Sequence, residues 1–186
     1  LLCDLAELYE GIWPAERCRE LLRMAEQTRE AIAVHCVKEK DGKRMYAWSV
    51  DLEGGWDVYD EPPGSLLLLP FRGFCSPEDG VWRNTVAVIR RKEYPYSFAG
   101  CPIAEIGCPH APHPWVLSIA NSLLSGNRES AREHLLRCVM DNGIACESVD
   151  EVTGESATGD AFATCAGFLA YAIDRAFGAG GNESGK

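Results

Sequence analysis

The chain has 186 residues, a formal net charge of −10 and a pI near 4.9. This length is enough for one domain that buries a real core. The acidic balance, without a stripe rich in Lys and Arg, excludes a nucleic-acid backbone as partner, and no apolar run is long enough to cross a membrane.

Nine cysteines are spread along the chain, and none of them forms a Cys-x-x-Cys pair. An odd count without paired spacing favours a reduced, cytoplasmic protein over a disulfide scaffold. No secretory signal is recognisable, since Asp4 and Glu7 follow closely on Leu1 and Leu2. Because the first residue is not Met, we expect a processed or truncated product.

The first third of the sequence predicts two helices and a small hairpin. One helix is already under way at the first residue and ends near Tyr9. A second runs over about 14–37, where apolar residues recur at helical spacing after a proline in the first turn. A charged turn over 38–43 then leads into a hairpin over 44–59.

Helices dominate the rest of the chain. Residues 66–71 predict a short buried helix, and a longer one begins with Ser76 as its cap and Pro77 in its first turn. Apolar periodicity predicts three more helices, over 115–124, 128–140 and 161–177. In the middle one of these we expect a buried side made of Ala131, Leu135, Leu136 and Val139.

The absence of a repeated β-α-β pattern argues against a doubly wound parallel sheet. Paired antiparallel helices that alternate with long loops predict a mostly α fold: an (α/α) toroid, here a partial barrel with a small β-hairpin. We expect 1–178 to form a single helical domain, half of such a barrel, and 179–186 a flexible tail. Half a barrel exposes apolar helix faces, so a homo-oligomer or poor solubility is expected.

Two polar loops, over 107–115 and 142–150, lie at the ends of helices in the C-terminal half. Together they supply His, Trp and carboxylate side chains. Sugars bind by stacking on aromatic rings and by polar groups placed around their hydroxyls, and glycoside hydrolysis uses paired carboxyl groups. The two loops therefore predict a carbohydrate pocket.

Three acidic residues have two interpretations each. Glu147 follows the apolar run 144–146, so it is either a partly desolvated catalytic carboxylate or a solvated loop residue. Asp60 and Glu61 precede two prolines. They hold sugar hydroxyls or order water, or else they belong to an Asp turn that caps the short helix that follows.

The first polar loop carries His110, His113 and Trp115. We expect His110 to lie in the pocket, and Trp115 either stacks on a sugar or packs into the core at a helix start. Cys101 and Cys108 add possible zinc ligands within the same short span. Their spacing differs from that of closed zinc sites, so we expect no metal there.

Five short motifs follow one another over residues 57–175 in the order found in one enzyme family. They are Asp60-Glu61, Asn84-Thr85, Tyr94-Pro95-Tyr96, Cys108-Pro109-His110 and Glu147-Ser148. With the run 66–74 between them, this region resembles the C-terminal half of glycoside hydrolase family 125. Members of that family are metal-independent exo-α-1,6-mannosidases with an (α/α)6 barrel.

The resemblance implies an inverting glycosidase that acts on an α-linked, mannose-type carbohydrate without a cofactor. It makes Glu147 the general base, with a pocket lined by Asp60, Glu61, His110, His113 and Trp115. Family members are about twice as long, and the loop that carries their proposed general acid has no counterpart here. A non-catalytic carbohydrate-binding or assembly module is therefore the alternative function.

Overall fold

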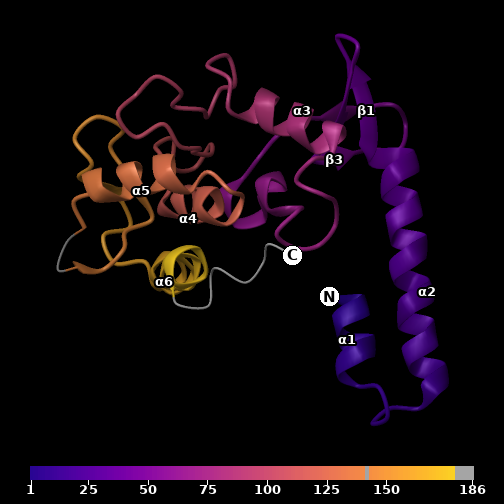
Figure 1. Ribbon diagram of the computed structural model, residues 1–186. Coiled ribbons are helices and arrows are strands. Elements are labelled where there is room, and N and C mark those ends of the chain that lie inside the picture. The colour runs from indigo at the N-terminus through magenta and orange to yellow at the C-terminus, as the bar shows by residue number, and fades with distance from the viewer. Residues whose placement is uncertain (141–142, 179–186) are drawn as a thin grey trace.

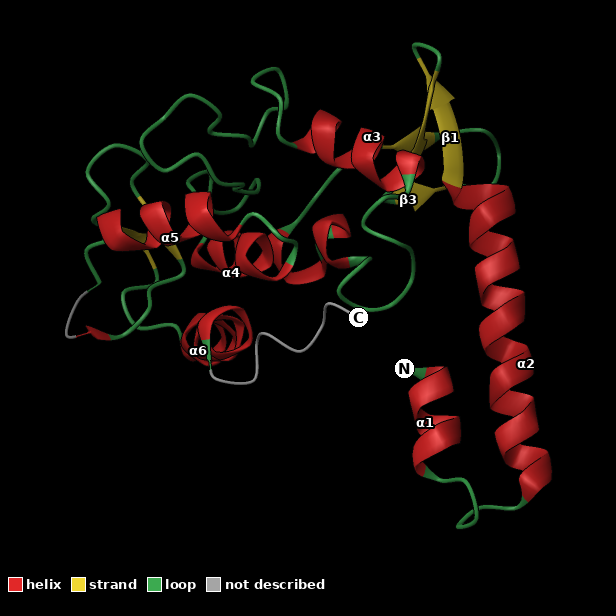
Figure 2. Ribbon diagram, in the orientation of Figure 1, coloured by secondary structure: helices red, strands yellow, loops and turns green. Residues whose placement is uncertain are grey.

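The computed structural model describes residues 1–140 and 143–178, and the fold is mostly helical (Figures 1 and 2). Its α-helices are α1 (Leu2–Leu8), α2 (Ala15–Ala31), α3 (Gly80–Ile89), α4 (Val116–Leu124), α5 (Arg128–Arg137) and α6 (Ala163–Phe177). Within these described ranges, no helix has both the length and the apolar character needed to cross a membrane. The predicted tail over 179–186 lies outside the described residues.

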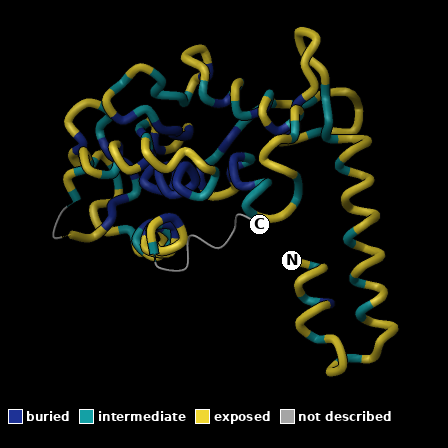
Figure 3. Tube along the Cα trace, in the orientation of Figure 1, coloured by how far each residue is buried: buried dark blue, intermediate teal, exposed yellow. Residues whose placement is uncertain are grey.

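The two N-terminal helices form a hairpin that stands to one side of the main body (Figure 1). None of the residues of α2 is buried, and most of the hairpin is exposed in Figure 3. Stacking of Tyr9 on Trp13, with ring centroids 4.1 Å apart, closes the turn between the helices. The predicted helix over 14–37 is α-helical only to Ala31 and ends in a π-helical turn, η1 (Ile32–Cys36).

The hairpin predicted over 44–59 is present in a shorter form, and a second hairpin precedes it. The preceding hairpin pairs β1 (Val37–Lys40) with β2 (Lys43–Tyr46), and the predicted one pairs β3 (Ser49–Val50) with β4 (Trp56–Asp57). Residues 38–40, predicted as part of a charged turn, are therefore strand. The tight two-residue turn at Asp41 and Gly42 has φ values of 54° and 72°, the geometry that matches the twist of a hairpin.

Helix α3 begins later than the sequence predicts. Its N-cap is Asp79, whose Oδ1 accepts hydrogen bonds from the backbone N–H groups of Val81 and Trp82 at 2.7 and 2.9 Å. Ser76 instead closes a local turn by accepting from the N–H of Glu78. The prediction of Ser76 as cap was wrong because Asp79 offers a carboxylate to two orphan donors at once.

The main core surrounds α4, which packs against α5 and α6. All of α4 except Leu124 is buried. For the helix predicted over 128–140, the buried side is correct at Ala131 and partly correct at Leu135, which packs against the core. It is wrong at Leu136 and Val139, which are 69% and 57% exposed. The helix ends at Arg137, and its inward stripe includes His134, which the hydrophobic pattern did not flag.

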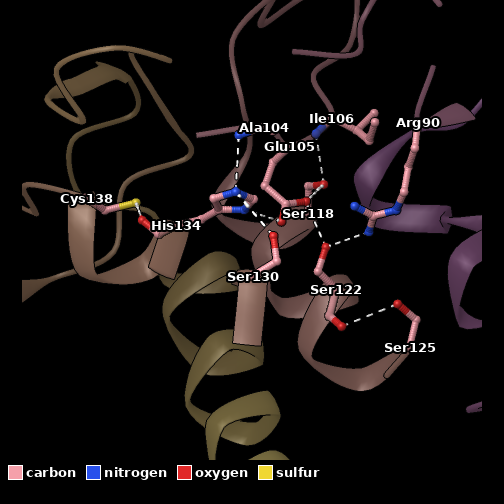
Figure 4. Close-up of polar contacts among 10 residues, drawn as sticks. All are labelled: Arg90, Ala104, Glu105, Ile106, Ser118, Ser122, Ser125, Ser130, His134 and Cys138. Atoms are coloured by element: carbon pink, nitrogen blue, oxygen red, sulfur yellow. Dashed lines mark hydrogen bonds and ion pairs between the residues drawn. The ribbon is translucent and has the colours of Figure 1, made fainter. Parts of the chain in front are cut away.

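A buried carboxylate joins this core to the loop that precedes α4 (Figure 4). Glu105 is fully buried, and its Oε2 accepts hydrogen bonds from Ser118 and Ser122 of α4, each at 2.8 Å. His134 of α5 lies with Nδ1 2.9 Å from Oε1. The Arg90 guanidinium at the end of α3 donates to the Ser122 hydroxyl at 2.7 Å. The Glu105 side chain therefore connects the loop to α4 and α5. Through Ser122 it is also connected to the end of α3.

We expect Glu105→Ala to lower the free energy of unfolding by about 3 kcal/mol or more, because it leaves buried donors without an acceptor. Urea denaturation measures the change. The control is Glu133→Ala on the exposed side of α5, which is expected to change stability by less than about 0.5 kcal/mol. Equal stability of the two variants would contradict the structural role of Glu105.

Candidate active site

The two polar loops predicted from the sequence lie side by side. Backbone bonds join them: the N–H of Val116 donates to the Glu147 carbonyl at 3.0 Å, and the N–H of Val149 donates to the Pro114 carbonyl at 2.9 Å. An isolated bridge pairs Trp115 with Ser148. The part of the second loop at Asn142 lies outside the described residues.

Within the first loop, a close backbone approach requires glycine. A Cβ on Gly107 would meet the carbonyl oxygen of His113 at 2.6 Å. The N–H of Cys108 donates to the carbonyl of Ala111 at 3.2 Å and closes a tight turn. This turn presents the side chain of His110, which is 60% exposed.

The His110 imidazole is the centre of a compact polar cluster. Its Nδ1 lies 3.2 Å from Cys108 Sγ and 3.6 Å from Glu61 Oε1, and its Nε2 lies 3.9 Å from Glu147 Oε1. The side chains of Glu61 and Glu147 are 30% and 17% exposed. Three residues predicted for the site from distant parts of the sequence, Glu61, His110 and Glu147, therefore meet here.

The Glu147 carboxylate is held from one side. Thr158 Oγ1 donates to Glu147 Oε2 at 2.8 Å, and Thr158 lies on β6 (Ser156–Thr158), which pairs with β5 (Ser148–Val149). Because a hydroxyl has one proton to give, the 2.6 Å contact between Ser148 and Thr158 requires Ser148 to donate. One carboxylate oxygen is thus fixed, and the other is directed toward His110.

Asp60 lies beside Glu61 in the chain but makes local contacts. Its Oδ2 accepts from the Ser65 hydroxyl at 2.8 Å and its Oδ1 from the N–H of Leu66 at 2.7 Å. Burial raises the pKa of Asp60 to about 6, although these hydrogen bonds oppose the shift. Both oxygens are therefore engaged at the start of the short 3₁₀-helix η3 (Leu66–Leu68), whose N-cap is Ser65. This helix is shorter than the one predicted over 66–71.

The remaining two predicted residues lie at the border of the cluster. Trp115 is only 2% exposed, and its Nε1–H donates to the Ala111 carbonyl at 3.1 Å. Its ring meets His110 edge to face, with centroids 5.2 Å apart, so it supports the imidazole from the core. His113 pairs with Glu151 at 3.1 Å and is not among the groups around His110. A direct sugar contact by Asp60, His113 or Trp115 stays a prediction.

Sequence reasoning missed two contributors, Thr158 and Tyr59. No local pattern marks Thr158, because only the β5–β6 pairing brings it to Glu147. Burial, together with the neighbouring Glu61 and Cys108, raises the pKa of Tyr59 to about 12. Tyr59 also lines a hollow of about 1010 Å³ with Trp48, Trp56, Tyr94 and Tyr96. This aromatic hollow adjoins the cluster at Tyr59, but Glu147 and His110 do not line it.

Gly159 lies so close to Glu147 that a larger residue there should destabilise the protein. This residue has a φ of 55°, and a Cβ there would meet the Cβ of Glu147 at 2.9 Å. We expect Gly159→Ala to cost about 1–2 kcal/mol and to displace the Glu147 side chain. Gly167→Ala is the control, because that glycine is exposed in α6 with open space around it and should gain about 0.5–1 kcal/mol. Urea midpoints that move together would contradict the strain at Gly159.

Comparison with known proteins identifies the family to which this chain belongs. A family model described as metal-independent alpha-mannosidase (GH125) matches residues 2–173. The meiotically up-regulated gene 157 protein of Schizosaccharomyces pombe is 30% identical over 167 residues, which are 84% of this chain and 33% of the relative. The chain therefore spans about a third of that curated relative.

A solved structure shares the fold. It is a Streptococcus pneumoniae protein from a family of metal-independent alpha mannosidases, described as a non-productive complex with alpha-1,6-mannobiose. It superposes with a TM-score of 0.80 at 21% identity and covers 94% of this chain and 44% of the bacterial chain. On the family match over nearly its whole length, this chain belongs to glycoside hydrolase family 125, the metal-independent α-mannosidases.

Proposed function

We propose that this chain carries the general base of an α-mannosidase active site and that Glu147 is that base. The supporting observation is the asymmetric environment of its carboxylate. Thr158 holds Oε2, whereas Oε1 is left to face His110 at 3.9 Å. A base must be fixed in direction yet keep one oxygen available for the proton that it takes.

In the proposed inverting reaction, Glu147 Oε1 removes a proton from a water molecule as the water oxygen attacks the anomeric carbon. The bond from that carbon to the leaving oxygen breaks, and the leaving oxygen takes a proton from a general acid on the opposite side of the sugar. We assign the acid to the part of the family protein beyond this chain, since this chain corresponds to 44% of the bacterial structure. The predicted (α/α) toroid would likewise be completed by that part.

The groups around Glu147 suit a polyhydroxylated ligand. His110, with its exposed ring, is placed to hydrogen-bond a hydroxyl, and Glu61 offers a second acceptor within the same cluster. We propose an α-linked mannoside as substrate, because the bacterial structure is described as a complex with alpha-1,6-mannobiose. The alternative is a carbohydrate-binding or assembly module, which is favoured by the partial length of the chain relative to its family.

Replacing the base tests this assignment. In the longest natural form of the protein, we expect Glu147→Gln to lower kcat on α-mannosides by about 10²–10⁴-fold, because an amide cannot accept the proton from water. Turnover of an aryl mannoside or mannobiose measures the loss. Glu151→Gln, which alters the carboxylate paired with His113, is the matched control and should retain activity.

Near-normal turnover by the Glu147→Gln enzyme would remove Glu147 from this role. Calorimetry with mannose and mannobiose distinguishes the enzyme from the alternative, a non-catalytic binding module. Binding by the longest form without any turnover would favour the non-catalytic module.

The exposed N-terminal hairpin leads us to propose that the isolated chain self-associates. Four large apolar side chains in this hairpin and in η1, which continues it, are 49–72% exposed: Leu8, Ile12, Leu22 and Val34. Exposed apolar surface of this kind promotes association. We expect light scattering to show oligomers that the double substitution of Ile12 and Leu22 by Lys reduces. Substituting Leu136, equally exposed but on α5, should have little effect, and a monodisperse wild-type monomer would contradict the proposal.

A further inference from the structure

We propose that Glu61, Cys108 and His110 form a binding site for a soft divalent cation such as Zn²⁺, and that an ion bound there blocks the proposed active site. One ligand atom from each residue lies within 4.8 Å of the others. The site is argued from these three side chains alone. Only the blocking effect rests on the proposed function.

The separations between the ligand atoms suit one small ion. Cys108 Sγ and His110 Nδ1 are 3.2 Å apart, and Nδ1 and Glu61 Oε1 are 3.6 Å apart. Around a tetrahedral zinc ion, with bonds of about 2.3 Å to sulfur and about 2.0–2.2 Å to nitrogen and oxygen, neighbouring ligand atoms lie about 3.3–3.6 Å apart. The third separation, between Cys108 Sγ and the Glu61 carboxylate, is at most 4.8 Å, so a side-chain shift of up to about 1 Å brings all three ligand atoms to one ion.

The donor types select the kind of metal. A thiolate, an imidazole and a carboxylate are all zinc ligands, and the thiolate favours Zn²⁺ and Co²⁺ over Mg²⁺ and Ca²⁺. On binding, the Cys108 thiol gives its proton to solvent and its sulfur bonds the metal. Three protein ligands leave a fourth position for water, and the exposed ring of His110 provides the route of entry.

The surroundings also supply an acceptor for the second ring nitrogen of His110. Metal-ligating histidines donate their other N–H to a carboxylate or carbonyl, which fixes the ring. Here Nε2 lies 3.9 Å from Glu147 Oε1, a gap that a small ring rotation closes to a hydrogen bond. Cys108 is held in turn by the backbone bond between its N–H and the Ala111 carbonyl.

This arrangement would inhibit the enzyme. A cation on Glu61 and His110 removes two groups proposed to bind sugar hydroxyls, and it directs the His110 N–H onto the free oxygen of the proposed base. Metal-independent catalysis and metal binding at the same residues are therefore compatible, with the ion as an inhibitor. The spacing along the sequence could not reveal the site, because Glu61 comes from a distant loop.

Cobalt titration of this chain, freed of metal with a chelator, tests the site directly. We expect one equivalent of Co²⁺ to produce a thiolate-to-cobalt charge-transfer band and the intense visible bands of four-coordinate cobalt, both abolished by added Zn²⁺. Cys108→Ser should remove the charge-transfer band, and His110→Ala and Glu61→Gln should each weaken binding at least about 10-fold. Circular dichroism confirms that each variant is folded.

Two controls guard against binding at the other cysteines and histidines. Cys101→Ser and His113→Ala alter the residues of the same types that are nearest along the sequence, and they should leave the titration unchanged. An unchanged charge-transfer band in Cys108→Ser, or an unchanged affinity in both His110→Ala and Glu61→Gln, would overturn the proposal. Because the spectrum reports metal binding itself, its outcome is independent of whether Glu147 acts as the base.

The inhibitory consequence has its own measurement in the longest natural form. Zn²⁺ should lower its mannoside turnover, a chelator should restore it, and the turnover that remains in Cys108→Ser should be at least about 10-fold less sensitive to Zn²⁺. Equal sensitivity of the wild type and Cys108→Ser would exclude inhibition through this site.

Discussion

The hydrogen-bonded burial of Glu105 is the constraint on which the arrangement of the site depends. A buried carboxylate is costly unless every oxygen has partners, and here Ser118, Ser122 and His134 supply them. Since those partners lie on α4 and α5, the loop that enters α4 can take only one position relative to the core. The N–H of Ile106 also donates to Ser118, at 3.0 Å, so this constraint reaches the residue before Gly107. The turn that presents His110 begins there.

A second constraint orients the proposed base. The β5–β6 pair brings Thr158 to one oxygen of Glu147, and the close approach of Gly159 leaves no room for another side chain. The carboxylate is therefore directed by backbone pairing, whereas His110 is directed by a tight turn. The same two constraints create both proposed functions of the cluster. They leave Glu147 Oε1 open for a proton, and they bring Cys108 and Glu61 close enough to His110 to share an ion.

The relation of the chain to its family gives these features a common explanation. The chain belongs to a family of metal-independent α-mannosidases, yet it spans 44% of the bacterial structure and a third of the yeast relative. Its exposed α1–α2 hairpin stands beside a well-packed body, as Figure 3 shows. We propose that the general base lies on this chain and the general acid on the rest of the family protein. This proposal explains why the Glu147 carboxylate is held in place while no residue of the cluster is assigned as the acid.

Local patterns were enough to predict the helical class, the approximate helix ranges, the two polar loops and the order of motifs that resembles the family. These features are local, since helical periodicity and short motifs need only neighbouring residues. Only the folded chain shows that His134 is buried against Glu105 and that Thr158 holds Glu147. The contact of Asp60 with the N–H of Leu66 is local, and it matches one of the two interpretations of the sequence. The Glu105–His134 contact joins residues 29 positions apart, and the Glu147–Thr158 contact depends on the pairing of β5 with β6. Long-range packing also brings Glu61 to Cys108 and His110. Local patterns in the sequence do not specify such contacts.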